Sequence, residues 1–281
     1  MDGILLINKE AGMTSFDVVR QCRNFYHEKK IGHTGTLDPN ATGLLLVLMG
    51  KYTKFIPYCA KDEKHYIGRF QLGISTDTED IWGNVMERKE TKAHTQEELD
   101  EIAASFIGKR TQIPPMYSAL KVDGKRLYEL ARKGVEVERK EREIEISSLS
   151  VKPIGLNEYE IDAIVSSGTY IRTLIQDFVR KLGEIGTMSA LERIGIEHLS
   201  ITQSITLNEL SMDALNNWQP LDVISKRYPL IEYEDLFTIK NGRKIKLDID
   251  DAVVILKNKD MLIAAYERRE DGYYHCLRGL F

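Results

Sequence analysis

Apolar residues along the chain follow two patterns, and each pattern predicts a different kind of strand. Continuous apolar runs at residues 3–7 and 44–49 predict buried strands. Alternation of apolar and polar residues at 66–72, 144–151 and 159–165 predicts strands with one polar face. The sequence therefore predicts a sheet with both fully buried and half-exposed strands.

Helical spacing occurs between these strands. A capping signal at residues 14–17 precedes apolar residues at helical spacing, including Phe25. A second capping box opens a helix over residues 95–106, and Thr169 is expected to cap a third helix that ends near residue 182. A short helix is expected from residue 51, broken at Pro57. The alternation of strands and helices predicts an α/β protein.

The C-terminal part has a different pattern. From about residue 229, strand-like runs at 252–256, 261–266 and 273–277 alternate with polar turns. Prolines at 220 and 229 bracket a linker before them. The chain is therefore expected to form a large domain over residues 1–225 and a small β module over 229–281.

Composition excludes several classes of protein. The 281 residues include 42% hydrophobic and 29% charged residues, which is typical of a soluble globular protein. We find no apolar run of about 18 residues and no signal-peptide pattern, so we expect a cytoplasmic protein without a membrane span. The three cysteines form no C-x-x-C pair, and the six histidines have no metal-ligand spacing. No metal or disulfide is expected.

The segment at residues 112–134 is basic, although the chain as a whole has a net charge of −4. It holds five lysines and arginines against two acidic residues, with Tyr117 and Tyr128 between them. Basic and aromatic side chains together suit RNA that is single-stranded or bent. A solvated helix face would have the same composition, so the pattern alone leaves both readings open.

The stretch GHTGTLDPNATG at residues 32–43 is the main candidate for chemistry. Its glycines relax the backbone, and Pro39 keeps Asp38 out of helical geometry. It is not a phosphate-binding P-loop, because no Gly-Lys-Ser/Thr follows. Taken alone, the stretch fits a surface turn as well as a catalytic loop.

Five ordered blocks resemble the TruB family, the tRNA pseudouridine-55 synthases. They accompany the loop at 32–43 and are INKEAGMTS, DEKHY, LGISTDTEDIWG, QIPPMYSALKVDGKRLYELARKG and SSGTYIRTLIQD. The resemblance implies a mixed α/β (α+β) pseudouridine-synthase fold with a largely antiparallel sheet and a central cleft. It also implies a PUA-like β domain at residues 229–281 and a thumb-like insertion at 112–134 that grips the tRNA.

The resemblance implies a catalytic set of three residues. Asp38 takes the place of the catalytic aspartate, and Arg172 is expected to be its ion-pair partner. Tyr66 is expected to stack on the target base and to take or relay a sugar proton. Asp38 could attack the sugar, add to the base, or stabilise charge while a sugar proton is removed, and the sequence does not choose among these.

The resemblance also implies residues that hold the flipped uridine. His33 would fill the place that the base leaves, and Tyr170 and Leu191 would line the pocket. Lys9 matches the basic residue of the family's first motif, but Glu10 follows it where the family has proline. We expect tRNA, through its T-arm stem-loop, as the partner of a monomer that needs no cofactor and no partner protein.

Two other functions fit part of the sequence. A tRNA-binding or tRNA-folding factor without catalysis would share the basic segment but would have no need of Asp38 with Arg172. A glycoside hydrolase would also use an aspartate, but no second carboxylate accompanies Asp38 in these blocks.

Overall fold

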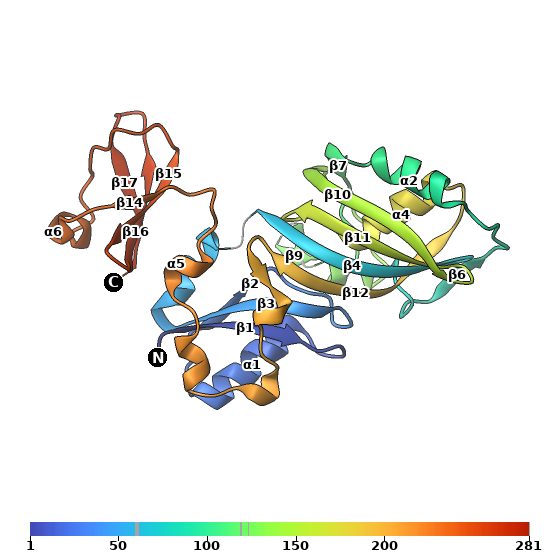
Figure 1. Cartoon of the computed structure of the whole chain (residues 1–281), viewed down its shortest axis with the longest axis horizontal. Coiled ribbons are helices and arrows are strands. Elements are labelled where there is room, and N and C mark those ends of the chain that lie inside the picture. The colour runs from blue at the N-terminus through green and yellow to red at the C-terminus, as the bar shows by residue number, and fades with distance from the viewer. Residues whose placement is uncertain (60–61, 119, 123, 281) are drawn as a thin grey trace. The chain divides into compact units, whose positions relative to one another are not determined.

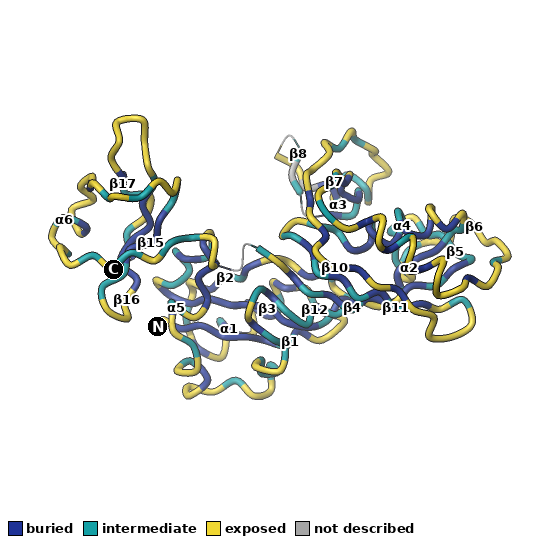
Figure 2. The backbone as a smooth tube through the Cα atoms, turned by 45° about the horizontal axis from the view of Figure 1, so that its top comes forward, coloured by how far each residue is buried: buried dark blue, intermediate teal, exposed yellow. Residues whose placement is uncertain are grey.

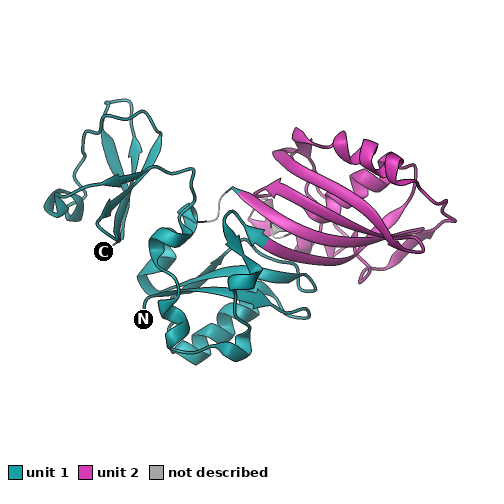
Figure 3. Ribbon diagram, viewed as in Figure 1, with its two compact units in different colours: residues 1–62, 195–281 teal, residues 63–194 magenta. Residues whose placement is uncertain are grey.

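The computed structural model describes residues 1–59, 62–118, 120–122 and 124–280. The chain divides into two compact units, one of residues 1–62 and 195–281, the other of residues 63–194 (Figure 3). Each unit is described by itself below. The predicted domain boundaries at residues 225 and 229 stay a prediction.

The first unit is built on strand β3 (Thr42–Met49), which pairs antiparallel with both β1 (Gly3–Lys9) and β2 (Ile31–Thr34) (Figure 1). Both predicted apolar runs are confirmed as strands, and nearly every residue of β1 and β3 is buried (Figure 2). A strand covered on both faces must be apolar throughout, which explains why these runs do not alternate.

Helix α1 (Ser15–Tyr26) covers one face of these strands. The predicted capping box is present, with Thr14 and Asp17 each bonded to the other's backbone. Val18 and Cys22 pack with Leu5 and Val47 of the sheet. The expectation that Phe25 belongs to the apolar face is wrong, because this side chain is exposed.

Residues 50–58 form the 3₁₀ helix η1 (Gly50–Tyr58). The predicted break at Pro57 is wrong, because the helix continues through this residue to Tyr58. Pro57 has no amide N–H to donate, so the helix passes through this residue without a hydrogen bond from it. The remaining short helices of this unit are η2 (Ile201–Gln203), η3 (Leu207–Glu209), η4 (Asp213–Asn216), α5 (Pro220–Val223) and α6 (Leu236–Lys240).

The second unit contains a sheet whose strands neighbour one another in the order β12-β4-β11-β10-β7 (Figure 1). Strand β11 pairs antiparallel with β4 and β10, and β10 with β7. Every second residue of β4 is buried, so the predicted alternation is confirmed. These strands are β4 (Glu63–Leu72), β7 (Gly108–Gln112), β10 (Arg142–Gly155), β11 (Glu158–Ser166) and β12 (Gly186–Ile196). The last two residues of β12 pair with β13 (Leu199–Ser200).

Helices α2 (Gln96–Ala104) and α4 (Ile171–Lys181) belong to this unit. The rings of Phe70, Phe106 and Phe178 meet between the sheet and the helices. The expectation that Thr169 caps α4 is wrong: the N-cap is Tyr170, without a side-chain bond. The smaller elements are β5 (Ile74–Thr76) paired with β6 (Val85–Arg88), β8 (Lys121–Val122) paired with β9 (Lys125–Arg126), and α3 (Leu127–Ala131).

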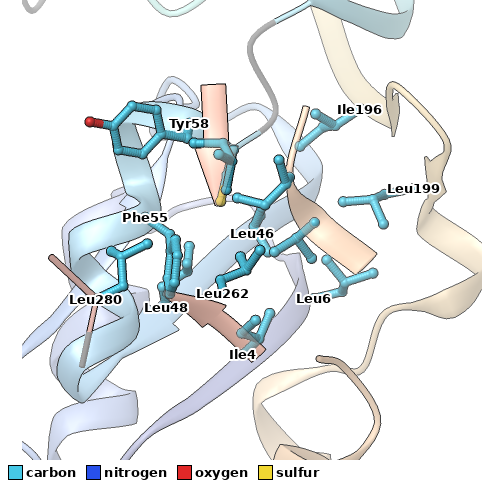
Figure 4. Close-up of a cluster of buried hydrophobic side chains, with 14 of the residues drawn as sticks. Ile4, Leu6, Leu46, Leu48, Phe55, Tyr58, Ile196, Leu199, Leu262 and Leu280 are labelled. Carbon is cyan, nitrogen blue, oxygen red and sulfur yellow. The ribbon is translucent and has the colours of Figure 1, made fainter. Parts of the chain in front are cut away.

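The C-terminal residues form a separate sheet in the order β14-β15-β16-β17. Its strands confirm the three predicted runs and add β14, which is parallel to β15. They are β14 (Leu230–Glu232), β15 (Val253–Asn258), β16 (Met261–Arg268) and β17 (Tyr274–Gly279). One buried cluster joins Leu262 and Leu280 of this part to Ile4, Leu46 and Leu48 of the N-terminal strands (Figure 4).

The mixed α/β class is therefore confirmed, and the extra C-terminal sheet agrees with a PUA-like module. The cleft expected across the larger sheet stays a prediction. In the part of the chain that the structure describes, every helix is too short or too polar to cross a membrane.

Candidate functional site

The candidate catalytic loop joins β2 to β3. Gly35 enters it with a φ of +73°, a left-handed conformation that glycine adopts without strain. Leu37 and Ala41 are buried on either side of Asp38, and the amide of Ala41 donates to the carbonyl oxygen of Asp38 at 3.1 Å. The two apolar side chains fix the loop, and Asp38 between them remains half-buried.

Lys9 ties this loop to the first strand. Its Nζ atom donates to the carbonyl oxygens of Glu10, Met13 and Pro39 at 2.8, 2.8 and 3.0 Å. The residue is fully buried. Its predicted contact with the substrate stays a prediction, and this burial makes it a support of the loop, because the ammonium would have to leave three carbonyl oxygens to reach RNA.

Ser15 is a second support of the loop, at the start of α1. Its hydroxyl group accepts a hydrogen bond from the amide of Leu37 at 2.9 Å and donates to the carbonyl oxygen of the same residue at 3.3 Å. Ser15 is 1% exposed, so these bonds are shielded from water. The backbone that leads to Asp38 is thereby held from the helix as well as from the strand.

His33 lies in β2, opposite Val47 of β3, and is half-buried. A strand position fixes its backbone more firmly than a loop would. The expected role of His33, filling the space left by a flipped base, stays a prediction.

In the second unit, Gln112 holds the turn before α4. Its side-chain oxygen accepts from the amide of Tyr170 at 2.8 Å, and its side-chain nitrogen donates to the carbonyl oxygen of Tyr170 at 3.1 Å. Gln112 is buried at the end of β7. This pair of hydrogen bonds positions Tyr170, the N-cap residue of α4.

Arg172 lies in the first turn of α4, with only 3% of its surface exposed. Nη1 donates to the carbonyl oxygen of Thr78 at 3.0 Å, and Nη2 to that of Tyr117 at 2.7 Å. An arginine on an ordinary helix face would be solvated, so the burial of Arg172 indicates a functional or structural role. Two backbone carbonyls fix the plane of the guanidinium group.

Tyr66 and Leu191 belong to the neighbouring strands β4 and β12. Both are buried, with 7% and 8% of their surfaces exposed. A Cβ atom at Gly68 would lie 3.6 Å from Cδ1 of Leu191. Because Gly68 is two residues after Tyr66, it faces the same side of the sheet. The absence of a side chain there makes room for Ile161, whose Cγ2 atom would lie only 2.8 Å from a Cβ atom at Gly68.

The predicted basic segment at 112–134 includes Ala119 and Asp123, which lie outside the described residues. Within the described part, Lys125, Arg132 and Lys133 are exposed. The guanidinium of Arg132 lies 5.6 Å from the centre of the Tyr128 ring, a cation–π distance. An exposed cation beside an aromatic ring suits RNA. The grip on tRNA expected of this segment stays a prediction.

The structure thus groups the predicted residues within each unit. Lys9, His33 and Asp38 are near or on one loop of the first unit, and Tyr66, Tyr170, Arg172 and Leu191 belong to the second. The pairing of Asp38 with Arg172 stays a prediction. Among the described residues, no group of His, Cys, Asp and Glu side chains is arranged to hold a metal ion.

Sequence reasoning missed Ser15, Gln112 and Glu79. The first two carry hydrogen bonds to residues 22 and 58 positions away, for which a sequence has no local signal. All three lie inside quoted blocks, Ser15 in INKEAGMTS, Gln112 at the start of QIPPMYSALKVDGKRLYELARKG and Glu79 in LGISTDTEDIWG, and these blocks could have drawn attention to them. Burial raises the pKa of Glu79, and the charges of Arg172 and Arg139 partly offset that rise.

The chain is similar in sequence to a family of known proteins. Residues 23–171 match the model of the N-terminal domain of TruB family pseudouridylate synthases. The chain is 44% identical, over 95% of its length and 92% of the relative's, to tRNA pseudouridine synthase B of Clostridium kluyveri. It is 41% identical, over 97% of its length and 96% of the relative's, to the Oenococcus oeni protein of the same name.

Solved structures agree in fold. A chain of a Cbf5–Nop10–Gar1 complex matches with a TM-score of 0.76 at 20% identity, covering 99% of this chain and 85% of that one. A chain of an archaeal box H/ACA Nop10–Cbf5 complex matches with a TM-score of 0.72 at 18% identity, covering 99% and 86%. At these identities the likeness shows the shared fold.

Proposed function

Because the chain belongs to the TruB family of pseudouridylate synthases, we propose that it isomerises uridine 55 in the T-loop of tRNA to pseudouridine. The observation that carries this proposal is its near-full-length similarity to proteins named tRNA pseudouridine synthase B. The reaction breaks the bond between the base nitrogen and the sugar, turns the base, and joins its C5 to the same sugar carbon. C5 loses a proton and the freed nitrogen gains one, so no redox group or group donor takes part.

Asp38 supplies the carboxylate that this chemistry needs. The carboxylate attacks the sugar, adds to the base, or stabilises charge while a sugar proton is removed. Arg172 keeps this carboxylate ionised by pairing with it. The proposal is supported by the firm backbone on each side: Lys9 and Ser15 hold the loop of Asp38, and the carbonyls of Thr78 and Tyr117 orient Arg172.

The target uridine must leave its stack, which costs a few kcal/mol. His33 fills the vacated place, Tyr66 stacks on the base, and Tyr170 and Leu191 line the pocket. The exposed cations of the segment at 112–134 and the PUA-like module at 229–281 bind the tRNA outside the pocket. A cytoplasmic monomer is the working form of the protein in this proposal.

The test is pseudouridine mapping on a tRNA transcript by chemical labelling and primer extension. Wild type should label position 55, and Asp38→Asn should lower the rate at least about a hundredfold. Asp260→Asn is the matched control, because Asp260 is exposed in the turn between β15 and β16. Wild type that binds tRNA and forms no pseudouridine would favour the non-catalytic binding factor instead.

A further inference from the structure

The turn between β5 and β6, together with the first residues of β6, carries four exposed apolar side chains that the proposed reaction leaves without a role. Their exposed fractions are 44% for Ile81, 49% for Trp82, 48% for Val85 and 70% for Met86. Apolar side chains that gather on a surface indicate an interaction site. Trp82 has the largest of the four side chains and is the aromatic one among them.

Hydrogen bonds within the turn hold the backbone of Trp82. The amide of Trp82 donates to Oδ1 of Asp80 at 3.1 Å, and the amide of Gly83 donates to the carbonyl oxygen of Asp80 at 3.2 Å. Asp77 closes the turn, because its carboxylate accepts from the amide and the side-chain nitrogen of Asn84 at 2.8 and 2.9 Å. A tryptophan on a fixed backbone loses little conformational entropy when it binds a partner.

The turn lies beside Arg172 and beside the strand that carries Leu191. The carbonyl oxygen of Thr78 accepts the 3.0 Å bond from Nη1 of Arg172. The amide of Ile81 donates to the carbonyl oxygen of Met188 at 2.9 Å, and Met188 is three residues before Leu191 on β12. The turn therefore borders the place where the proposed function puts the target uridine.

Trp82 is kept close to Thr78 by the tightness of this turn. A Cβ atom at Gly83, the next residue, would lie only 2.2 Å from Oγ1 of Thr78. The turn can close in this way because glycine has no side chain. The backbone of Trp82 is thereby held near the carbonyl group that binds Arg172.

The surroundings of the turn favour RNA as the partner. The guanidinium group of Arg172 also donates to the carbonyl oxygen of Tyr117 at 2.7 Å, so the turn and the basic segment at 112–134 meet at this arginine. That segment is the one expected to grip the tRNA. Unstacked bases of an RNA loop bind by stacking on exposed aromatic rings. A protein bound to the same patch would lie where the proposed function needs the tRNA.

We propose that Trp82 stacks on a T-loop nucleobase next to the target uridine and so helps to position the tRNA. The inference rests on the proposed function, which puts the target uridine beside Arg172. Trp82 takes no part in breaking or forming bonds, so it is a positioning residue for the substrate. Because every base has a face that can stack, this contact depends on the position of the nucleotide more than on its identity.

The first test compares three variants of Trp82 in pseudouridine assays on a T-arm hairpin RNA. In Trp82→Ala, KM should rise about tenfold, while kcat changes less than about threefold. Trp82→Phe keeps an aromatic face and should stay within about threefold of the wild-type KM, whereas Trp82→Leu should resemble the alanine variant.

Phe16→Ala, at an exposed aromatic residue of α1, is the matched control and should behave as wild type. A wild-type KM in Trp82→Ala, or equal KM values for the leucine and phenylalanine variants, would overturn the proposal.

The second test observes the contact by fluorescence. The chain has two tryptophans, so Trp218→Phe leaves Trp82 as the only one. In this variant combined with Asp38→Asn, which slows turnover, the T-arm hairpin should quench the emission of Trp82, because a stacked base quenches an indole ring. Abasic replacements in the loop beside the uridine, made one at a time, should identify the position that removes the quenching. Binding of the hairpin without quenching would overturn the proposal.

The two tests together separate this inference from the proposed function. If wild type binds the hairpin and forms no pseudouridine, the proposed function fails, but the fluorescence titration still reports whether a base stacks on Trp82. Quenching would then support the contact in a non-catalytic binding protein. If pseudouridine forms and Trp82→Ala has the wild-type KM, the proposed function stands and the contact with Trp82 is wrong.

Discussion

The Nζ atom of Lys9 lies 3.0 Å from the carbonyl oxygen of Pro39, so a fully buried cation holds the backbone directly after Asp38. The amide of Gly12 donates to the same oxygen at 3.0 Å. The first strand and its turn thus form one support with the candidate catalytic loop. These contacts hold the backbone next to Asp38 together with Leu37 and Ala41, the buried residues of the loop itself.

Replacing Lys9 with methionine should destabilise the fold and slow the reaction together. Lys9→Met keeps most of the apolar stem, but it leaves the three carbonyl oxygens without this donor, and we expect the free energy of unfolding to fall by about 2–4 kcal/mol. We expect kcat to fall about a hundredfold as the loop shifts. Urea unfolding and single-turnover assays measure the two effects. Lys29→Met, at an exposed lysine, is the control, and equal stability of the two variants would contradict this role.

Gln112→Leu tests the turn that carries Tyr170 and Arg172. Leucine has a similar size but cannot pair with the backbone of Tyr170, so the Tyr170 amide loses the Gln112 acceptor and the Tyr170 carbonyl oxygen loses one of its two donors. We expect the free energy of unfolding to fall by about 1–3 kcal/mol, with a lower kcat.

The control for this variant is Gln21→Leu on the exposed face of α1, measured in the same urea titration. If Gln112→Leu unfolds at the wild-type urea concentration and retains its kcat, the double hydrogen bond does not position the turn.

Local patterns predicted much of the fold. The alternation at 66–72 matches β4 because burial on one face of a strand leaves a period of two in the sequence. The Thr14 capping box could also be predicted, since all its residues lie within a stretch of four. Phe25 was misplaced because helical spacing alone does not distinguish it from Tyr26, and Tyr26 is the one that is buried.

The candidate site was less predictable, for a physical reason. Its residues could be named from motif blocks, but their partners are backbone groups far along the chain. Arg172 donates to carbonyl oxygens 94 and 55 residues away, and every residue has a carbonyl. A sequence pattern shows which side chains are present, but it does not show which backbone carbonyl group a guanidinium will contact in the fold.

Gly68→Ala should disturb the packing around Ile161, next to Leu191. The new Cβ atom would lie 2.8 Å from Cγ2 of Ile161 and 3.6 Å from Cδ1 of Leu191, and the first distance requires a shift. We expect a loss of about 1–3 kcal/mol in the free energy of unfolding, since overpacking strains the neighbours. The KM for tRNA should rise if Leu191 contacts the substrate.

The comparison variant is Gly155→Ala in β10, where the nearest atom is the flexible end of Glu158 at 3.3 Å. It should unfold nearly as wild type does. A Gly68→Ala protein with wild-type stability and KM would mean that Ile161 and Leu191 move aside freely.

Asp271 should make the stability of the C-terminal module depend on pH in the acidic range. Hydrogen bonds from the Tyr273 amide, His275 and Lys244 lower the pKa of Asp271 from 3.8 to about 2. A depressed pKa means that the folded state prefers the ionised form, so its stabilising effect is full above pH 3.8 and is lost as the pH falls toward 2. In Asp271→Asn, the urea midpoint should therefore fall less than that of wild type between these pH values. Asp260→Asn should follow the wild-type curve, and parallel curves for wild type and Asp271→Asn would show that these three hydrogen bonds do not favour the carboxylate.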